Sequence, residues 1–129
     1  MPTYTKLNFA EVKDLAPDYG MSDMGEARFA RGALGAEHIG LSRYRMNPGH
    51  RLGFGHRHER SEEAYVVLSG SGRFRVQDDV FDVGPQDIVY CPPGAMRGWE
   101  AGPDGMELLA FGAHTEGENT EMDREFWTD

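Results

Sequence analysis

Residues 55–70 read GHRHERSEEAYVVLSG and carry the most specific pattern in the chain. His56 and His58 stand two positions apart, so on a β-strand both side chains point to the same face. Glu63 follows after a short turn that can bring its carboxylate beside them. Two neutral imidazoles and one carboxylate on one face form the ligand set of Fe(II), and less selectively of Mn, Ni, Cu or Zn. The stretch therefore predicts a divalent transition-metal site at His56, His58 and Glu63.

The residue between the two histidines indicates which side of this strand faces inward. A His-x-His pair can also belong to a polar strand edge that faces solvent. In that case Arg57 would point into the core, and arginine is almost never fully buried without a partner. Placing both imidazoles inside avoids this conflict, and buried imidazoles then need a polar partner such as a metal or a carboxylate.

The composition is that of one acidic, turn-rich domain. The chain has 129 residues with 17 glycines and 7 prolines, and no long segment has helical periodicity, which favours a single all-β domain. The formal net charge of −9 and the pI of about 4.9 argue against nucleic acid and membrane surfaces as partners, because both attract basic patches. No apolar segment reaches the roughly 18 residues of a membrane span.

The cysteine content and the N-terminus favour a cytoplasmic location. Cys91 is the single cysteine, so no disulfide can form within the chain, as is usual in a reducing compartment. Residues 1–6 lack the basic and apolar segments of a signal peptide. The simplest role for Cys91 is that of a small buried hydrophobic residue.

Short alternating segments follow one another at intervals of about ten residues. Turn signals separate them at residues 47–49 (NPG), 70–72 (GSG), 84–85 (GP), 92–94 (PPG) and 102–105 (GPDG). This spacing is typical of a sandwich or barrel. It predicts about nine short strands, over residues 26–30, 39–46, 52–58, 64–68, 73–77, 80–83, 87–91, 95–101 and 106–111.

Both ends of the chain lie outside this pattern. Residues 1–22 form a predicted N-terminal arm or short helix, and residues 23–113 form the predicted barrel. Residues 114–129 hold six acidic residues and one arginine, a composition typical of a disordered tail. The aromatic pair Phe126-Trp127 would alternatively allow this tail to dock on the barrel or on a second subunit.

Two motifs in the chain resemble those of the cupin family. The pattern His56-x-His58-x(4)-Glu63-x(6)-Gly70 resembles the first cupin motif. Residues 84–94, GPQDIVYCPPG, resemble the second, which centres on a Pro-x-Gly turn. The spacing between the two motifs fits small one-domain cupins.

This resemblance implies an all-β fold, the double-stranded β-helix or jelly-roll barrel, which is often a homodimer. It also implies that a metal is held inside the barrel by His56, His58 and Glu63. The neighbouring Glu62 is a weaker candidate for the carboxylate ligand. The spacing to Gly70 favours Glu63, and strand alternation then sends Glu62 outward.

The second motif departs from the family pattern at three positions. Gln86 stands where a glycine usually opens the turn, and Ala101 stands where an asparagine is usual. Arg97 takes the place of the histidine that is the usual fourth ligand, and a guanidinium cannot bind a metal. Three roles of Arg97 compete. It faces out of the barrel, it binds a substrate carboxylate or phosphate beside a three-ligand metal, or it pairs with Glu63 and replaces the metal.

Other candidates for the site are weaker. Tyr65 shares the face of Glu63, and we expect it to pack in the core or to join Arg97 in catalysis. The remaining candidates are surface or packing residues in their simplest interpretation: His38, His50, His114, Met96 and Trp99.

Together these patterns predict a small cupin that binds a divalent transition metal and a small, anionic organic ligand. The leading hypothesis is a metal-dependent oxygenase or isomerase, since a metal with open positions can activate O2 or polarise a carbonyl. The alternative is a non-catalytic, metal-free binding or sensing domain in which Arg97 closes on Glu63. We expect a homodimer, because a lone jelly roll leaves strand edges and apolar faces that need to be covered.

Overall fold

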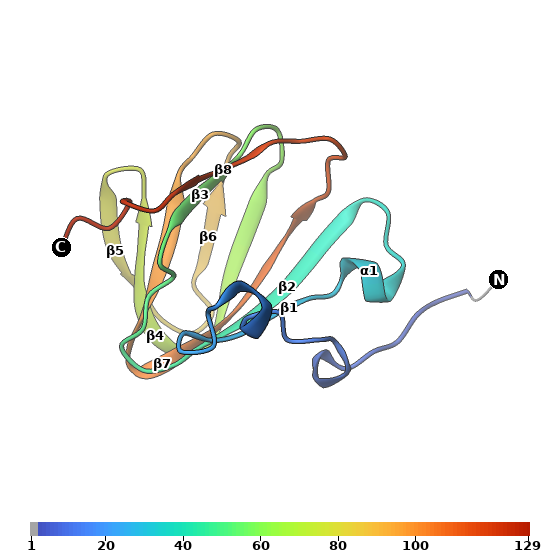
Figure 1. Ribbon diagram of the computed structural model, residues 1–129, viewed down its shortest axis with the longest axis horizontal. Coiled ribbons are helices and arrows are strands. Elements are labelled where there is room, and N and C mark those ends of the chain that lie inside the picture. Colours follow the sequence, from blue (N-terminus) through green and yellow to red (C-terminus); the bar gives the residue numbers. More distant parts are fainter. Residues whose placement is uncertain (1–2) are drawn as a thin grey trace.

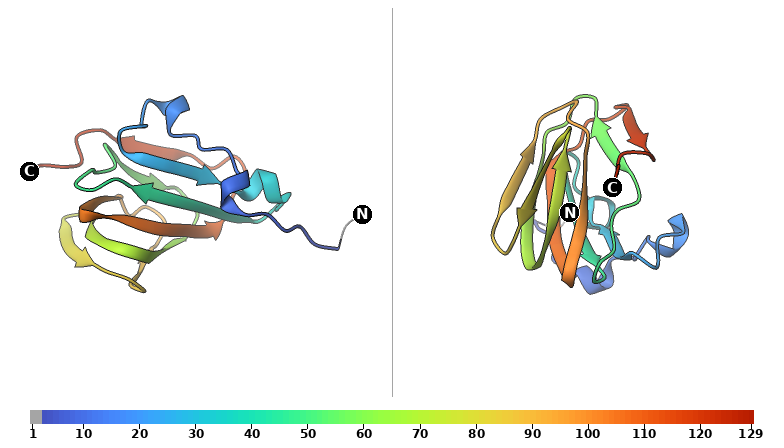
Figure 2. Two further views of the ribbon diagram at one scale, coloured as in Figure 1. Left: turned by 90° about the horizontal axis from the view of Figure 1, so that it is seen from below. Right: turned by 90° about the vertical axis from the view of Figure 1, so that its left-hand side faces the viewer.

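Residues 3–129 are described by a computed structural model in which antiparallel strands form one curled sheet (Figure 1). The sheet folds over into two layers, as the right-hand view of Figure 2 shows. The all-β jelly-roll barrel expected from the sequence is confirmed. The strands are β1 (Gly25–Phe29), β2 (Ile39–Met46), β3 (Gly55–His58), β4 (Glu63–Val76), β5 (Asp79–Val83), β6 (Ile88–Cys91), β7 (Arg97–Ala113) and β8 (Thr120–Asp123). The helical elements are α1 (Arg31–Leu34) and the 3-10 turns η1 (Phe9–Glu11) and η2 (Pro17–Tyr19).

Two long strands, β4 and β7, replace four of the short strands expected from the sequence. They pair with each other along most of their length. The glycine-rich segments 70–72 and 102–105, which predicted turns, are instead irregularities within this pairing. Gly70 has a φ of +76°, and a Cβ there would lie 2.1 Å from the Gly105 carbonyl oxygen, so only glycine permits this close approach. The first part of β7 pairs with β3 and its second part with β2, so one strand links the two ends of the sheet.

The strand that carries the two histidines lies between β7 and the C-terminal strand β8. In the pairing of β3 with β8, Gly55 is opposite Asp123 and His58 is opposite Thr120. Beyond β8, Phe126 is buried, and a Cβ on Gly55 would lie 2.5 Å from its ring. The prediction of a disordered tail is therefore wrong, and the alternative prediction, in which the tail docks on the barrel, is correct. The limits of the predicted arm, barrel and tail stay predictions.

The N-terminal arm contains two short 3-10 turns, η1 and η2, in place of a continuous helix. Its first turn, η1, is capped by Asn8, whose side chain accepts the Ala10 N–H at 2.9 Å. The chain then extends at Val12, and Asp14 accepts the N–H groups of Ala16 and Ala27. Because Ala27 lies in β1, this carboxylate attaches the arm to the edge of the sheet.

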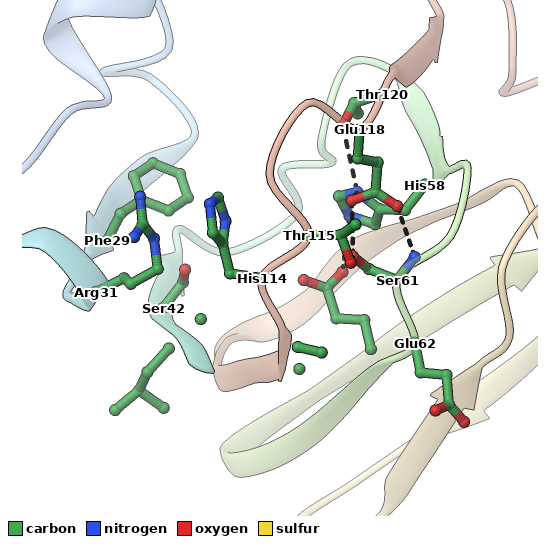
Figure 3. Close-up of a pocket in the computed structure, with 15 residues that line it drawn as sticks. Phe29, Arg31, Ser42, His58, Ser61, Glu62, His114, Thr115, Glu118 and Thr120 are labelled. Atoms are coloured by element: carbon green, nitrogen blue, oxygen red, sulfur yellow. Dashed lines mark hydrogen bonds and ion pairs between the residues drawn. The ribbon is translucent and has the colours of Figure 1, made fainter. Parts of the chain in front are cut away.

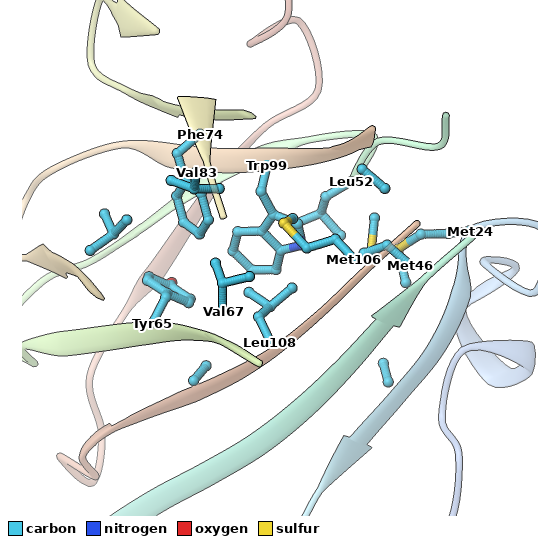
Figure 4. Packing of buried hydrophobic residues seen from close by; sticks show 14 of the residues in the cluster. Met24, Met46, Leu52, Tyr65, Val67, Phe74, Val83, Trp99, Met106 and Leu108 are labelled. Atoms are coloured by element: carbon cyan, nitrogen blue, oxygen red, sulfur yellow. The ribbon is translucent and has the colours of Figure 1, made fainter. Parts of the chain in front are cut away.

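The core lies between the two layers and centres on Trp99 (Figure 4). Its indole is fully buried and lies edge-on or tilted against Tyr44, Tyr65 and Phe74, with ring centroids 5.0–5.6 Å apart. Trp99 is thus a packing residue. Among residues 3–129, no helix is long and apolar enough to cross a membrane. The cytoplasmic location stays a prediction.

Candidate metal centre

The two histidines of β3 point to the inner side of the sheet, and the arginine between them points out. The side chains of His56 and His58 are 12% and 20% exposed. Arg57 is 45% exposed and pairs with Glu121 of β8. The alternation argument from the sequence therefore holds for this strand.

Glu63, the first residue of β4, brings its carboxylate to the two imidazoles. Its Oε1 lies 3.7 Å from Nε2 of His56 and 3.5 Å from Nε2 of His58. Glu62 is exposed and accepts a hydrogen bond from the Tyr90 hydroxyl at 2.5 Å, on the outer side of the sheet. Of the two neighbouring glutamates, Glu63 is the one that lies with the histidines.

The spacing of these three donors fits a single metal ion. One donor atom from each residue lies within 4.8 Å of the others. Two ligands bound to one ion at about 2.0–2.1 Å with tetrahedral angles lie about 3.4 Å apart. The two nitrogen–oxygen distances to Glu63 are close to this value. They are also long for hydrogen bonds, so contact with the carboxylate alone does not satisfy the imidazoles.

Arg97 and Tyr65 complete the cluster from the side of the core. Arg97 lies directly opposite His56 in the pairing of β7 with β3, and its side chain is fully buried. It donates from Nε to the Tyr65 hydroxyl at 2.9 Å, from Nη1 to the Ala95 carbonyl at 2.8 Å, and from Nη2 to Glu63 Oε1 at 3.1 Å. The Tyr65 hydroxyl donates to the same carboxylate oxygen and lies 3.4 Å from His56 Nε2.

This arrangement decides part of the question about Arg97. The role in which it faces out of the barrel is wrong, because the side chain is enclosed. The contact with Glu63 that the metal-free role requires is present. A direct clamp on a ligand has no support in the structure, since the Arg97 side chain is fully buried and does not line the cavity beside His58.

The surroundings set the protonation of the cluster. Burial would raise the pKa of the Glu63 carboxyl, but the nearby imidazoles of His56 and His58, the hydrogen bond from Tyr65 and the charge on Arg97 hold it well below its usual range. Burial lowers the pKa of His56, against the opposing effect of Glu63. Burial and the nearby Glu63 raise the pKa of Tyr65 well above its usual value. An ionised carboxylate and a neutral imidazole are the forms that bind a metal.

The C-terminal segment supplies partners to one histidine only. Nδ1 of His58 lies 3.2 Å from the Thr120 hydroxyl and 3.8 Å from a carboxylate oxygen of Glu118. Glu118 is itself fixed, because it accepts the backbone N–H of Ser61 at 2.6 Å and the Ser61 hydroxyl at 2.7 Å. In contrast, the buried Nδ1 of His56 has no partner among the described residues. Such partners hold the ring of a ligand histidine in place. The ring of His58 is therefore held by more contacts at Nδ1 than the ring of His56.

A cavity of about 280 Å³ opens beside His58 and Glu63 (Figure 3). Residues of the tail and of the β3–β4 turn form one wall, and residues at the ends of β1, α1, β2 and β7 form the other. The sequence pattern gave no signal for most of this lining. The polar and aromatic side chains that were not anticipated are Phe29, Arg31, Ser42, Ser61, Thr115, Glu118 and Thr120.

The remaining candidate residues lie apart from the His56–His58–Glu63 cluster, and one of them lines the cavity beside it. His38 and His50 are exposed and do not line the cavity, and Cys91 is buried in the core. Met96 is half-buried beside Arg97. His114 is exposed as expected, yet it lines the cavity.

Comparison with known proteins assigns the chain to a family. The sequence model of the cupin domain family matches residues 42–111 of this chain. No curated protein matches the chain. Among solved structures, a cupin protein from Bacteroides fragilis is 19% identical with a TM-score of 0.73, and the match covers 91% of this chain and 89% of that one.

Two further solved structures of similar size carry different activities in their names. A sugar phosphate isomerase of the cupin superfamily from Silicibacter pomeroyi is 18% identical with a TM-score of 0.73, over 90% of this chain and 80% of that one. A polyketide cyclase from Streptomyces resistomycificus is 20% identical with a TM-score of 0.72, over 97% of this chain and 87% of that one. At this level of identity the likeness shows the fold alone.

Proposed function

Since this chain belongs to the cupin domain family, we propose that it binds a divalent transition metal through His56, His58 and Glu63 and a small organic molecule in the adjoining cavity. The observation that carries the proposal is the convergence of three donor atoms at the spacing of ligands to one ion, two of them from residues that line the cavity. Fe, Mn, Ni, Cu and Zn all accept two imidazoles and a carboxylate.

The proposed activity is that of an oxygenase or isomerase acting on a small organic acid or sugar derivative. The metal, when bound, supplies Lewis-acid or oxygen-activating chemistry at the positions that three protein ligands leave open. The protein itself prepares the site. Arg97 orients Glu63 and keeps it ionised, and Tyr65 keeps its proton on the hydroxyl, where it serves as a hydrogen-bond donor.

A specific observation favours a second candidate function, a metal-free binding domain. Arg97 and Tyr65 both donate to Oε1 of Glu63, and these two hydrogen bonds occupy the lone pairs of that oxygen. A metal must then compete for this oxygen or take the other one. Under this alternative the cluster is a structural ion pair, and the cavity binds its ligand without a metal.

Metal titration distinguishes the two candidates. We expect calorimetry to show binding of Fe(II), Mn, Ni or Zn to metal-depleted protein. The protein is first purified without chelator, and its metal is removed in a separate step before the titration. The double variant His56→Ala/His58→Ala should abolish this binding, because a single carboxylate paired with an arginine is a poor site. Equal metal uptake by the double variant would place the site elsewhere.

A matched control removes two histidines that do not line the cavity. His38→Ala/His50→Ala changes exposed side chains, so it should bind metal as the wild type does. If the wild type takes up no metal under any of these conditions, the metal-dependent function is wrong and the metal-free alternative stands.

A further inference from the structure

The cavity beside the candidate metal centre has a second wall that the proposed function leaves without a role. His58 lies on one side, and Arg31 and His114 lie on the other, with Phe29 and Ser42 (Figure 3). Glu63 also lines the cavity, 3.5 Å from His58. We propose that Arg31 binds the oxyanion group, carboxylate or phosphate, of the small molecule whose other end meets the metal. This inference rests on the proposed function and adds to it the charge and the orientation of the substrate.

The first support is that Arg31 has no carboxylate partner within residues 3–129. Each of the other arginines lies within 4.0 Å of a carboxylate oxygen, with Arg124 as the exception. In a chain with a formal net charge of −9, acidic partners are plentiful. Arg31 is therefore a cation whose charge is left uncompensated at the wall of a cavity, where an anionic ligand can meet it.

The second support is the way in which Arg31 is held. It is the first residue of α1, and its Nη1 donates one hydrogen bond to the Ala36 carbonyl at 3.3 Å. Its own carbonyl accepts the N–H groups of Gly35 and Ala36, which closes the turn around it. A guanidinium has five N–H groups, so four remain for a ligand. Its planar fork matches a carboxylate or phosphate in two-point contact.

The third support is the distribution of charge around the cavity. The wall near the metal centre carries the carboxylates of Glu63 and Glu118, whereas Arg31 is the one arginine among the described residues that line the cavity. In the metal-free protein these carboxylates repel the charged end of an anionic molecule, and a bound divalent metal offsets their charge and leaves Arg31 as a second point of attraction. Such a molecule therefore lies with its oxyanion toward Arg31 and with a hydroxyl or carbonyl toward His58 and Glu63. A volume of about 280 Å³ suits a molecule of few heavy atoms.

Glycolate is the smallest probe with this layout, because it has one carboxylate and one hydroxyl. Methyl phosphate tests the phosphate form of the anion, and glycolamide is the uncharged counterpart of glycolate. Each is titrated into the protein with Zn²⁺ and into chelator-treated protein, and binding is followed by NMR shifts of backbone amides around the cavity. We expect saturable binding of at least one anion and none of glycolamide.

Arg31→Ala should weaken binding of that anion by about tenfold or more, the effect of losing a charge-assisted hydrogen bond. Arg124→Ala is the matched control, since it removes the other arginine that lacks an ion pair and lies outside the cavity. It should leave the anion affinity unchanged. The inference is overturned if Arg31→Ala binds as the wild type does, if both variants lose affinity equally, or if the wild type binds neither anion.

Failure of this inference is separable from failure of the proposed function. Calorimetry of Arg31→Ala with Zn²⁺ alone should match the wild type, because Arg31 is no metal ligand. If the wild type binds no metal, the proposed function fails. The titrations of chelator-treated protein then still decide whether Arg31 binds the anion.

Discussion

Arg97 stands directly opposite His56, in the place where the family usually has a fourth metal ligand. At about 5 Å and an effective dielectric constant of about 20, its charge opposes each unit of metal charge by about 3 kcal/mol. We therefore expect Arg97→His to raise metal affinity by about a hundredfold or more, because it removes this repulsion and adds an imidazole. Calorimetric titration of the variant and the wild type with Zn²⁺ or Mn²⁺ measures the effect.

Arg97→Met separates the two contributions, since it removes the charge without adding a ligand. We expect its metal affinity to lie between those of the wild type and Arg97→His. Thermal unfolding must show that both variants are folded, because Arg97 is fully buried and donates to Tyr65 and Ala95. Unchanged affinity in two folded variants would show that the guanidinium does not oppose the metal.

At the scale of elements, β8 and the turn before it hold the strand that carries the histidines. Glu118 accepts hydrogen bonds from Arg60 N–H, Ser61 N–H and the Ser61 hydroxyl, and so joins the tail to the β3–β4 turn. Burial would raise the pKa of the Glu118 carboxyl, but these hydrogen bonds lower it below its usual value. The ionised carboxylate therefore stabilises the fold at neutral pH.

Glu118→Gln should lower the free energy of unfolding at pH 7 by about 1 kcal/mol. A carboxyl with a depressed folded-state pKa contributes stability above its unfolded pKa of about 4.3, and this is lost as the pH falls through the folded value. The difference between wild type and variant should therefore shrink below about pH 4. Urea unfolding at pH 7 and pH 3 tests this, with the exposed Glu116→Gln as control. A pH-independent difference would contradict it.

At the scale of the whole molecule, the outer face of the sheet presents an apolar row that crosses four strands. Phe111 is opposite Leu41 of β2 and Ala64 of β4, and Ala64 is opposite Tyr90 of β6. Phe111 and Tyr90 are 50% and 55% exposed. The Phe126-Trp127 pair packs on its own barrel and is not free to cover this row, since Phe126 is buried and Trp127 Nε1 donates to the Leu52 carbonyl.

We therefore predict that the expected homodimer forms through this row. Light scattering at micromolar concentration should give a dimeric mass for the wild type and a monomeric mass for Phe111→Glu, because a charge at the centre of an apolar interface opposes association. Val80→Glu changes an exposed residue of β5 outside the row and should remain dimeric. A monomeric wild type would contradict the dimer, and a dimeric Phe111→Glu would move the interface elsewhere.

The succession of short strands and the inward direction of the two histidines were predictable from the sequence, because both depend on local rules, and the resemblance of the two motifs implied the barrel. Strand alternation places His56 and His58 on one face and Arg57 on the other. Glycine and proline mark most of the turns correctly. They failed at residues 70–72 and 102–105, where β4 and β7 continue through irregular pairing. A glycine that permits a close strand approach and a glycine that makes a turn look alike in a sequence.

Only the tertiary structure decided which distant residues meet at the site. Arg97 reaches Glu63, 34 positions away, because β7 and β4 bring them to the same inner face. Arg31 faces the cavity, and Glu118 lies 3.8 Å from His58 because β8 pairs with β3. Such contacts depend on the register between strands far apart in the chain. A shift of one residue in that register would turn each side chain to the opposite face, and no local pattern specifies it.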